Sequence, residues 1–190
     1  MSRIIAGSAK GARLKAPAGA NTRPTTDRTR EALFSSLVTW FDCADAETFS
    51  QLAGVEVLDL FAGSGAIGLE AASRGASVTL VEKAKPAAAV ITANMKATRL
   101  SAKLANCTVE SFLESEPRPF DLVWLDPPYG FATVKINSLI ARLTEGWLGA
   151  DALVVVERSV RDEPPTWPAR YDESWQKKYG ETALYYARCS

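Results

Sequence analysis

A buried strand that ends at two prolines is the feature of this sequence that most constrains the fold. Residues 120–125 are β-prone and all but one are apolar, which is typical of a strand covered on both faces. The strand ends at Asp126, because Pro127 and Pro128 have no N–H to donate to a neighbouring strand. We therefore expect a rigid turn that holds the Asp126 carboxylate, a proline carbonyl and the ring of Tyr129 together.

Strands and helices alternate along most of the chain, which predicts an α/β fold with a mainly parallel sheet between two helical layers. Apolar runs predict strands over residues 55–60, 76–81, 103–107, 120–125 and 152–157. Helical spacing of apolar residues predicts helices over residues 27–41, 64–74, 86–99, 110–115 and 134–145. Residues 175–179 and 182–188 are expected to close the sheet as an antiparallel hairpin, and residues 3–6 and 12–15 to form a small N-terminal hairpin. Residues 42–54 are expected to be a connector with a short helical piece.

The charge of the chain is unevenly distributed. Residues 1–30 hold seven basic residues and one acid, a charge of +6, and the remaining 15 basic and 21 acidic residues give −6. We expect a basic arm over residues 1–24 and one main domain over residues 25–190. A basic arm on an acidic body favours a polyanionic partner, although a solvated charged surface has the same composition. The candidate contacts are Arg3, Lys10, Arg13, Arg23, Arg28 and Arg30.

Several classes of site are excluded or disfavoured by composition. The chain has no histidine, which removes histidine acid–base catalysis, Ser-His-Asp triads and histidine metal sites. Cys43, Cys107 and Cys189 are widely spaced and lack a metal-ligand pattern, so reduced thiols and no bound metal are expected. No apolar stretch has the length of a membrane span, and the expected location is the cytoplasm.

A glycine-containing turn follows the first strand of the main domain. The run Asp59-Leu60-Phe61-Ala62-Gly63-Ser64-Gly65 is a strand end, a turn and a helix start, where backbone N–H groups converge on a ligand. Glu82 ends the next strand, where a carboxylate can accept both ribose hydroxyls of an adenosine. Taken alone, either feature is also compatible with an ordinary turn or a solvent-facing side chain. Together with the Asp126 turn across the crevice, they predict an adenosine cofactor that faces a second substrate.

The Asp126 turn offers what a planar amine requires for methylation. An aryl amine is a poor nucleophile until acceptors for its N–H bonds turn the nitrogen towards sp³ geometry. The Asp126 carboxylate and the Pro127 carbonyl are such a pair of acceptors, and they would direct the lone pair at a methyl donor. Tyr129 would stack on the base. Because the methylated amine loses its proton to water or Asp126, this chemistry needs no histidine.

Nearly the whole chain resembles one family. The sequence is similar to the RsmD family of S-adenosylmethionine-dependent methyltransferases, which methylate the 2-amino group of a guanine in 16S ribosomal RNA. The most discriminating match is the Arg-Pro-Thr run. The matching segments are Arg3-Ile4-Ile5-Ala6-Gly7, Arg23-Pro24-Thr25-Thr26-Asp27-Arg28, Arg30-Glu31-Ala32-Leu33-Phe34, Asp59 to Gly65, Asp126-Pro127-Pro128-Tyr129 and Tyr179-Gly180.

The resemblance implies a Rossmann-like class I methyltransferase fold, with a seven-stranded, mostly parallel sheet and the N-terminal hairpin as an extension. S-adenosylmethionine would be the cofactor, and ribosomal RNA, free or in an assembling 30S particle, the partner. Glu82 would hold the ribose. Where relatives often place a polar or acidic side chain against adenine, this chain reads Asn106-Cys107-Thr108-Val109-Glu110, and the expected adenine contact is the Val109 backbone. The residues expected along the methionine part are Asp59, Phe61, Gly63 and Gly65, with Asp126 beside the reacting group.

Other functions remain compatible with parts of this pattern. An adenine-N6 methyltransferase acting on DNA or RNA would need the same two turns, and a nicotinamide enzyme would need the same glycine turn. A protein glutamine methyltransferase more usually carries Asn in place of Asp126, and a non-catalytic RNA-binding module would not need the intact turn. The basic arm and the absence of a separate target-recognition domain favour RNA.

Overall fold

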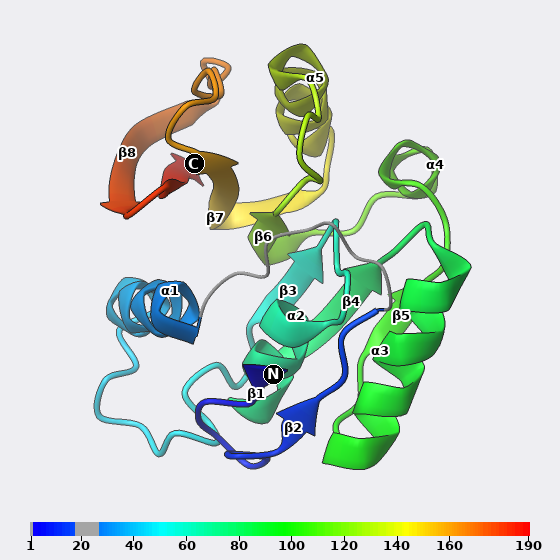
Figure 1. Ribbon diagram of the computed structural model, residues 1–190. Coiled ribbons are helices and arrows are strands. Elements are labelled where there is room, and N and C mark those ends of the chain that lie inside the picture. Colours follow the sequence, from blue (N-terminus) through cyan, green and yellow to red (C-terminus); the bar gives the residue numbers. More distant parts are fainter. Residues whose placement is uncertain (1, 18–26) are drawn as a thin grey trace.

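The computed structural model describes residues 2–17 and 27–190. Its main sheet has seven strands in the order β5-β4-β3-β6-β7-β9-β8 (Figure 1). Strands β3 to β7 pair in parallel, and β9 runs antiparallel between β7 and β8. This topology confirms the predicted parallel sheet with a closing antiparallel hairpin. The strands are β3 (Glu56–Asp59), β4 (Ser77–Val81), β5 (Lys103–Ala105), β6 (Phe120–Leu125), β7 (Leu148–Ser159), β8 (Tyr171–Tyr179) and β9 (Thr182–Cys189).

Helices cover both faces of this sheet. Apolar side chains of α1, α2 and α3 join one core cluster, and those of α4 and α5 join another. Neighbouring residues of β3 show the alternation, since Val57 belongs to the first cluster and Leu58 to the second. The helices are α1 (Asp27–Trp40), α2 (Ala66–Ser73), α3 (Lys85–Thr98), α4 (Val109–Leu113) and α5 (Thr133–Leu143).

The strand order reverses beside β3. From β3 the chain moves outward to β4 and β5, then crosses to β6 and β7 on the other side of β3. The turn after β3 bonds to both neighbours, because Leu60 N donates to Trp124 O (3.0 Å) and Ala62 N donates to Val81 O (3.0 Å). Open α/β sheets bind their ligands at such a switch point, outside the carboxyl ends of the strands.

The N-terminal hairpin lies on the helical layer formed by α2 and α3 (Figure 1). Its strands, β1 (Ser2–Arg3) and β2 (Arg13–Leu14), pair antiparallel, as the sequence predicts. Ile4 and Leu14 are buried and form a small core with Leu69 of α2. The hairpin therefore covers the helix that follows the glycine turn.

Two predicted elements differ from the structure. Residues 42–54 form turns and contain no helix. The last hairpin is longer than expected, since β8 begins at Tyr171, and strand β7 also begins earlier than expected, at Leu148. The residues added at the start of β7 include a glycine, and those added at the start of β8 are mostly polar. Strand β8 lies at the edge of the sheet and is exposed along most of its length, so an apolar run is not required for it to form. Within the described ranges, no helix combines the length and apolar character that a membrane crossing requires.

Candidate functional site

The glycine turn after β3 is bonded to the end of β4. Gly63 and Gly65 adopt positive φ angles of 56° and 79°, a conformation that side chains with a Cβ rarely tolerate. The Gly63 N–H donates to Glu82 Oε2 (2.8 Å), and the Gly65 N–H donates to Ala62 O (2.6 Å). The two predicted cofactor segments are thus in direct contact at the carboxyl edge of the sheet.

Glu82 is half-buried and held in one orientation. Its second oxygen, Oε1, accepts from Ala84 N (2.7 Å), while its backbone bonds to the end of β5 and to the Asn106 amide. A carboxylate has about four acceptor sites, so two backbone donors leave capacity for two hydroxyls. This is the arrangement expected of a side chain that holds a ribose.

Asp59 is a buried carboxyl at the base of the same edge. Its side chain is 1% exposed, and its Oδ1 accepts from Phe61 N (3.3 Å). Burial, with a smaller contribution from the negative charge of Glu82, raises the pKa of Asp59 to about 7, although backbone hydrogen bonds from Phe61 and Gly68 act to lower it. A cationic ligand above the turn would favour the ionised form of Asp59.

The Asp126 turn lies at the same edge as the glycine turn. Asp59 pairs with Trp124 in the β3–β6 ladder, so Asp126 follows two residues beyond the end of that pairing. The turn is closed by a hydrogen bond from Phe131 N to Pro128 O (3.0 Å). Asp126 is half-buried, whereas the Tyr129 side chain is 92% exposed and presents its ring to solvent.

An aromatic pair joins the two turns. The rings of Phe61 and Phe131 meet edge to face, with centroids 5.4 Å apart at 72°. Arg158, at the end of β7, donates from Nη1 to Phe131 O (2.9 Å) and pairs with Asp162. Neither Phe131 nor Arg158 was identified from the sequence. An aromatic residue directly after the Asp-Pro-Pro-Tyr-Gly run was the available signal.

Val109 is the first residue of α4. Its side chain is buried in the cluster that contains Leu60 and Val81, and the Thr108 hydroxyl caps the helix by accepting from Ser111 N (3.2 Å). Because the side chain faces the core, only the backbone of Val109 is left for contact with a ligand.

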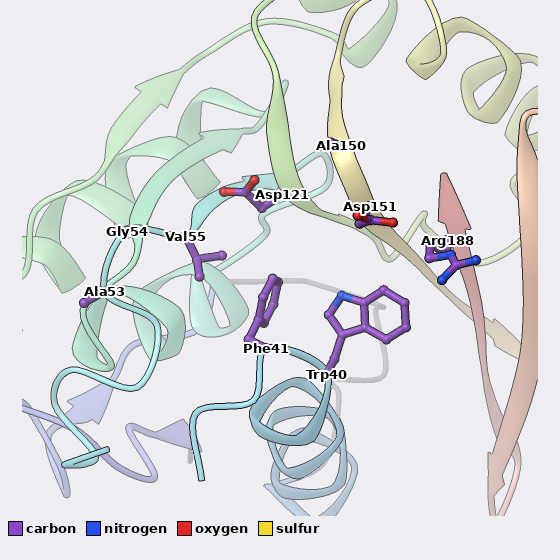
Figure 2. A pocket seen from close by; sticks show the side chains of 9 residues that line it. All are labelled: Trp40, Phe41, Ala53, Gly54, Val55, Asp121, Ala150, Asp151 and Arg188. Atoms are coloured by element: carbon purple, nitrogen blue, oxygen red, sulfur yellow. The ribbon is translucent and has the colours of Figure 1, made fainter. Parts of the chain in front are cut away.

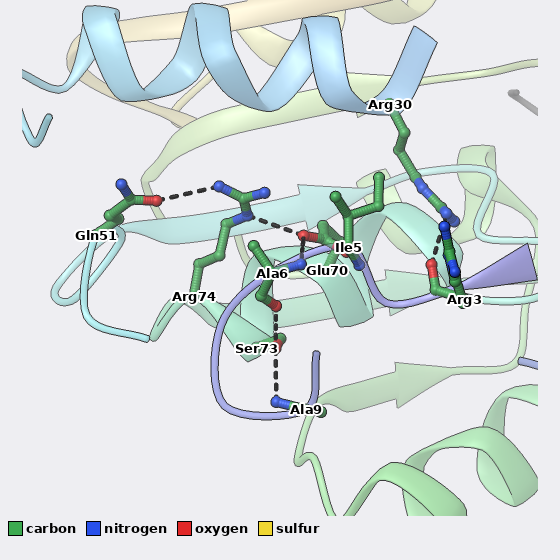
Figure 3. Close-up of polar contacts among 9 residues, drawn as sticks. All are labelled: Arg3, Ile5, Ala6, Ala9, Arg30, Gln51, Glu70, Ser73 and Arg74. Atoms are coloured by element: carbon green, nitrogen blue, oxygen red, sulfur yellow. Dashed lines mark hydrogen bonds and ion pairs between the residues drawn. The ribbon is translucent and has the colours of Figure 1, made fainter. Parts of the chain in front are cut away.

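Most of the basic candidates among residues 1–30 are exposed, but Arg30 is not. Arg3, Lys10, Arg13 and Arg28 have exposed side chains, and Arg23 lies outside the described residues. The Arg30 side chain is 0% exposed and donates to Arg3 O (2.6 Å; Figure 3). It also donates to Ser2 Oγ (2.7 Å) and Asp27 Oδ1 (2.7 Å).

The burial of Arg30 corrects the expectation that it is a surface contact for a polyanion. Its guanidinium joins α1 to the hairpin, and burial lowers its pKa from the ordinary value. The helical spacing of the sequence indicates this burial, because position 30 lies on the same face of α1 as the buried Leu33, Phe34 and Leu37.

A separate cavity of about 620 Å³ lies away from these turns, beside the amino ends of β3 and β6 (Figure 2). Trp40 and Phe41 from the end of α1 form part of its wall. Asp121, which also lines the cavity, accepts a hydrogen bond from Glu56 N (2.8 Å) and so helps to join β6 to β3. The cavity is therefore distinct from the candidate site.

The comparisons with known proteins identify the family. Residues 2–188 match the family model described as Conserved hypothetical protein 95. The Ribosomal RNA small subunit methyltransferase D of Escherichia coli (strain K12) is 36% identical over 185 residues, which cover 95% of this chain and 86% of that protein. The chain belongs to this family, the RsmD family.

Solved structures confirm the fold of this RsmD-family chain. The E. coli protein yhhF superposes with a TM-score of 0.83 at 32% identity, covering 99% of this chain and 97% of that one. A more distant Thermus thermophilus structure, the 16S rRNA N2 G1207 methyltransferase RsmC in complex with AdoMet and guanosine, has a TM-score of 0.66 at 22% identity, covering 90% and 46%. The predicted class I methyltransferase fold is confirmed, while the role of each site residue stays a prediction.

Proposed function

We propose that this protein is an S-adenosylmethionine-dependent methyltransferase that modifies the 2-amino group of a guanine in small-subunit ribosomal RNA. Membership of the RsmD family and the name of its E. coli relative support ribosomal RNA as the substrate. The observation that carries the amine chemistry is the Asp126-Pro127 turn, which is packed against the glycine turn through Phe61 and Phe131.

The residues at this edge fit the cofactor. Gly63 has open space where a Cβ would project, so a ligand can approach the backbone of the turn closely. The buried carboxyl of Asp59 and the fixed carboxylate of Glu82 suit a ligand that carries positive charge and a ribose diol. We assign Asp59, Phe61, Gly63 and Gly65 to the methionine part, and Glu82 and the Val109 backbone to the adenosine. When bound, the cofactor supplies an electrophilic methyl group on a sulfonium.

The Asp126 turn prepares the amine. Its carboxylate and the Pro127 carbonyl accept the two N–H bonds of the target nitrogen, which localises the lone pair and directs it across the crevice. Tyr129 stacks on the target base, and its exposure leaves the ring available for that contact. After transfer, the proton of the methylated amine passes to an Asp126 oxygen or to water.

The basic arm, residues 1–24, would hold the RNA beside the methyltransferase domain of residues 25–190. The exposed side chains of Arg3, Lys10 and Arg13 in the arm, and of Arg28 in α1, carry the positive charge that neutralises phosphates. Arg23 is assigned the same role from the sequence alone.

A transfer assay tests both the activity and the target. Small-subunit ribosomal RNA from cells that lack the protein is incubated with radiolabelled S-adenosylmethionine, as free RNA and within 30S particles, and the nucleosides are then separated by mass spectrometry. We expect N2-methylguanosine. N6-methyladenosine would refute the guanine assignment, and RNA binding without transfer would favour a non-catalytic module.

Variants of the turn test the roles of its residues. Asp126→Ala is expected to fold and to bind S-adenosylhomocysteine, but to lose about 10²-fold or more in turnover. Tyr129→Ala should raise the KM for RNA, whereas the matched Tyr129→Phe, which keeps the ring and loses only the hydroxyl, should not. Turnover by Asp126→Ala at the wild-type rate would remove Asp126 from the mechanism.

A further inference from the structure

Asn94 of α3 connects the N-terminal arm to the glycine turn through one side chain. Its Oδ1 accepts from Lys15 N (2.9 Å), and its Nδ2 donates to both Lys15 O (3.0 Å) and Ser64 O (2.9 Å). The residue is 1% exposed, so these bonds form away from water. Lys15 directly follows β2, and Ser64 lies between the two glycines of the turn.

The choice of asparagine at this position has no explanation in the helix itself. Asparagine is a poor residue for a helix interior, and the neighbouring inward position, Ile91, is apolar. A buried amide is tolerated only when its donors and acceptors are paired, and here both N–H groups and the oxygen are used. An apolar side chain would remove the bonds of the Lys15 peptide groups and of Ser64 O to the amide.

The hairpin has separate anchors that do not involve the glycine turn. Glu70 of α2 accepts from Ile5 N (2.6 Å) and Ala6 N (3.0 Å), and Ser73 donates to Ala6 O (2.6 Å) (Figure 3). These contacts are made by residues that follow β1, whereas Lys15 follows β2, and none of them involves Asn94. Asn94 is therefore not required to dock the hairpin, but it connects the end of the arm with the turn.

The side chains around Lys15 face outward while its backbone is held. Arg13 and Lys15 are both exposed, so a phosphate bound by them restricts the same backbone segment that pairs with the Asn94 amide. The same Asn94 nitrogen donates to Lys15 O in the arm and to Ser64 O in the glycine turn, so the orientation of one amide group affects both contacts. An ordered arm thus fixes the carbonyl beside Gly63 and Gly65.

We propose that Asn94 is a positioning residue that couples the two ligands: RNA bound to the arm strengthens cofactor binding at the glycine turn, and cofactor strengthens RNA binding. The inference rests on the proposed function, since it requires that the arm binds RNA. Coupling between two sites is reciprocal, so both affinities must change by the same factor.

Calorimetry measures this factor directly. The Kd of S-adenosylhomocysteine is determined with and without saturating unmethylated small-subunit ribosomal RNA, used as a free transcript and within 30S particles from cells lacking the protein. For the wild type we expect RNA to tighten S-adenosylhomocysteine binding about fivefold or more. In Asn94→Ala and Asn94→Asp the factor should fall towards one. Thr98→Val, one helical turn along α3, is the matched control, because Thr98 is buried and its hydroxyl donates to two carbonyls of the same helix, Asn94 O and Met95 O.

The outcomes separate this inference from the proposed function. A wild-type coupling factor in both Asn94 variants would overturn the role of Asn94, and a factor of one in the wild type would overturn the coupling even if methyl transfer is observed. Failure of RNA to bind the wild type would refute the proposed function together with the coupling. If circular dichroism shows that the Asn94 variants are unfolded, Lys15→Pro, which removes the N–H donor of the arm, should abolish coupling, whereas Lys15→Ala, which removes only the charged side chain, should retain it. Equal coupling in these two variants would overturn the role of the Asn94 contact.

Discussion

Asp59 is predicted to destabilise the folded protein at neutral pH, and Asp59→Asn measures by how much. Its carboxyl has an ordinary pKa of 3.8, which rises to about 7 on burial. At about 1.4 kcal/mol per pKa unit, this rise corresponds to roughly 4 kcal/mol. The folded state holds the proton more tightly than the unfolded state, so the free energy of unfolding should fall as pH rises from about 4 to about 7, and the full penalty applies above 7.

Asparagine has the same shape and cannot ionise, so Asp59→Asn should lose this part of the pH dependence. We expect urea denaturation to show the variant more stable than the wild type at pH 8, by up to roughly 4 kcal/mol, with the gap shrinking towards pH 5. The variant should also bind S-adenosylhomocysteine more weakly, because the ligand then loses an anionic partner. Asp45→Asn, an exposed carboxyl, controls for the loss of one charge. Equal stability differences between wild type and Asp59→Asn at pH 5 and pH 8 would refute the reasoning.

Two matched pairs of variants test the hairpin and the arm. A Cβ at Gly7 would lie 1.9 Å from Ser73 O, whereas one at Gly11 meets nothing within 4 Å, and both residues have positive φ angles. Gly7→Ala should therefore undock the hairpin and weaken RNA binding in filter-binding assays, and Gly11→Ala should cost only the backbone strain of about 1–2 kcal/mol; equal effects would contradict the contact. Arg28→Ala should lower the salt slope of RNA binding by about 1 without loss of stability. Arg30→Ala should instead lower the free energy of unfolding by about 2–3 kcal/mol, because it removes three hydrogen bonds made by a buried guanidinium, and an unchanged urea midpoint would argue against this.

The two turns at the edge of the sheet were predictable because their signals are local. Pro127 and Pro128 end β6 because proline has no N–H to donate, whatever the surrounding fold. The glycines after Asp59 permit the positive φ angles found at Gly63 and Gly65. The alternation of strands and helices then placed both turns at one edge. The polar strand β8 was only partly predicted, because an edge strand pairs through its backbone and tolerates exposed side chains.

The charge count was informative for residues 1–30 as a whole but not for each basic residue among them. The count treated Arg28 and Arg30 alike, although one is exposed and the other is buried beneath the hairpin. Arg30 differs from Arg28 because it bonds to Ser2 and Arg3, which lie 28 and 27 positions earlier in the sequence. No local sequence pattern spans such a distance.

By itself, the sequence determined the elements, their order and the chemistry available at the carboxyl edge, because backbone propensities and side-chain functional groups belong to each position. Only the tertiary structure decided which polar groups serve the interior. Glu70 and Asn94 bond to backbone groups 64, 65 and 79 residues away, and such pairings exist only after the chain has packed. Burial then made these bonds obligatory, because a polar group removed from water needs a partner within the protein.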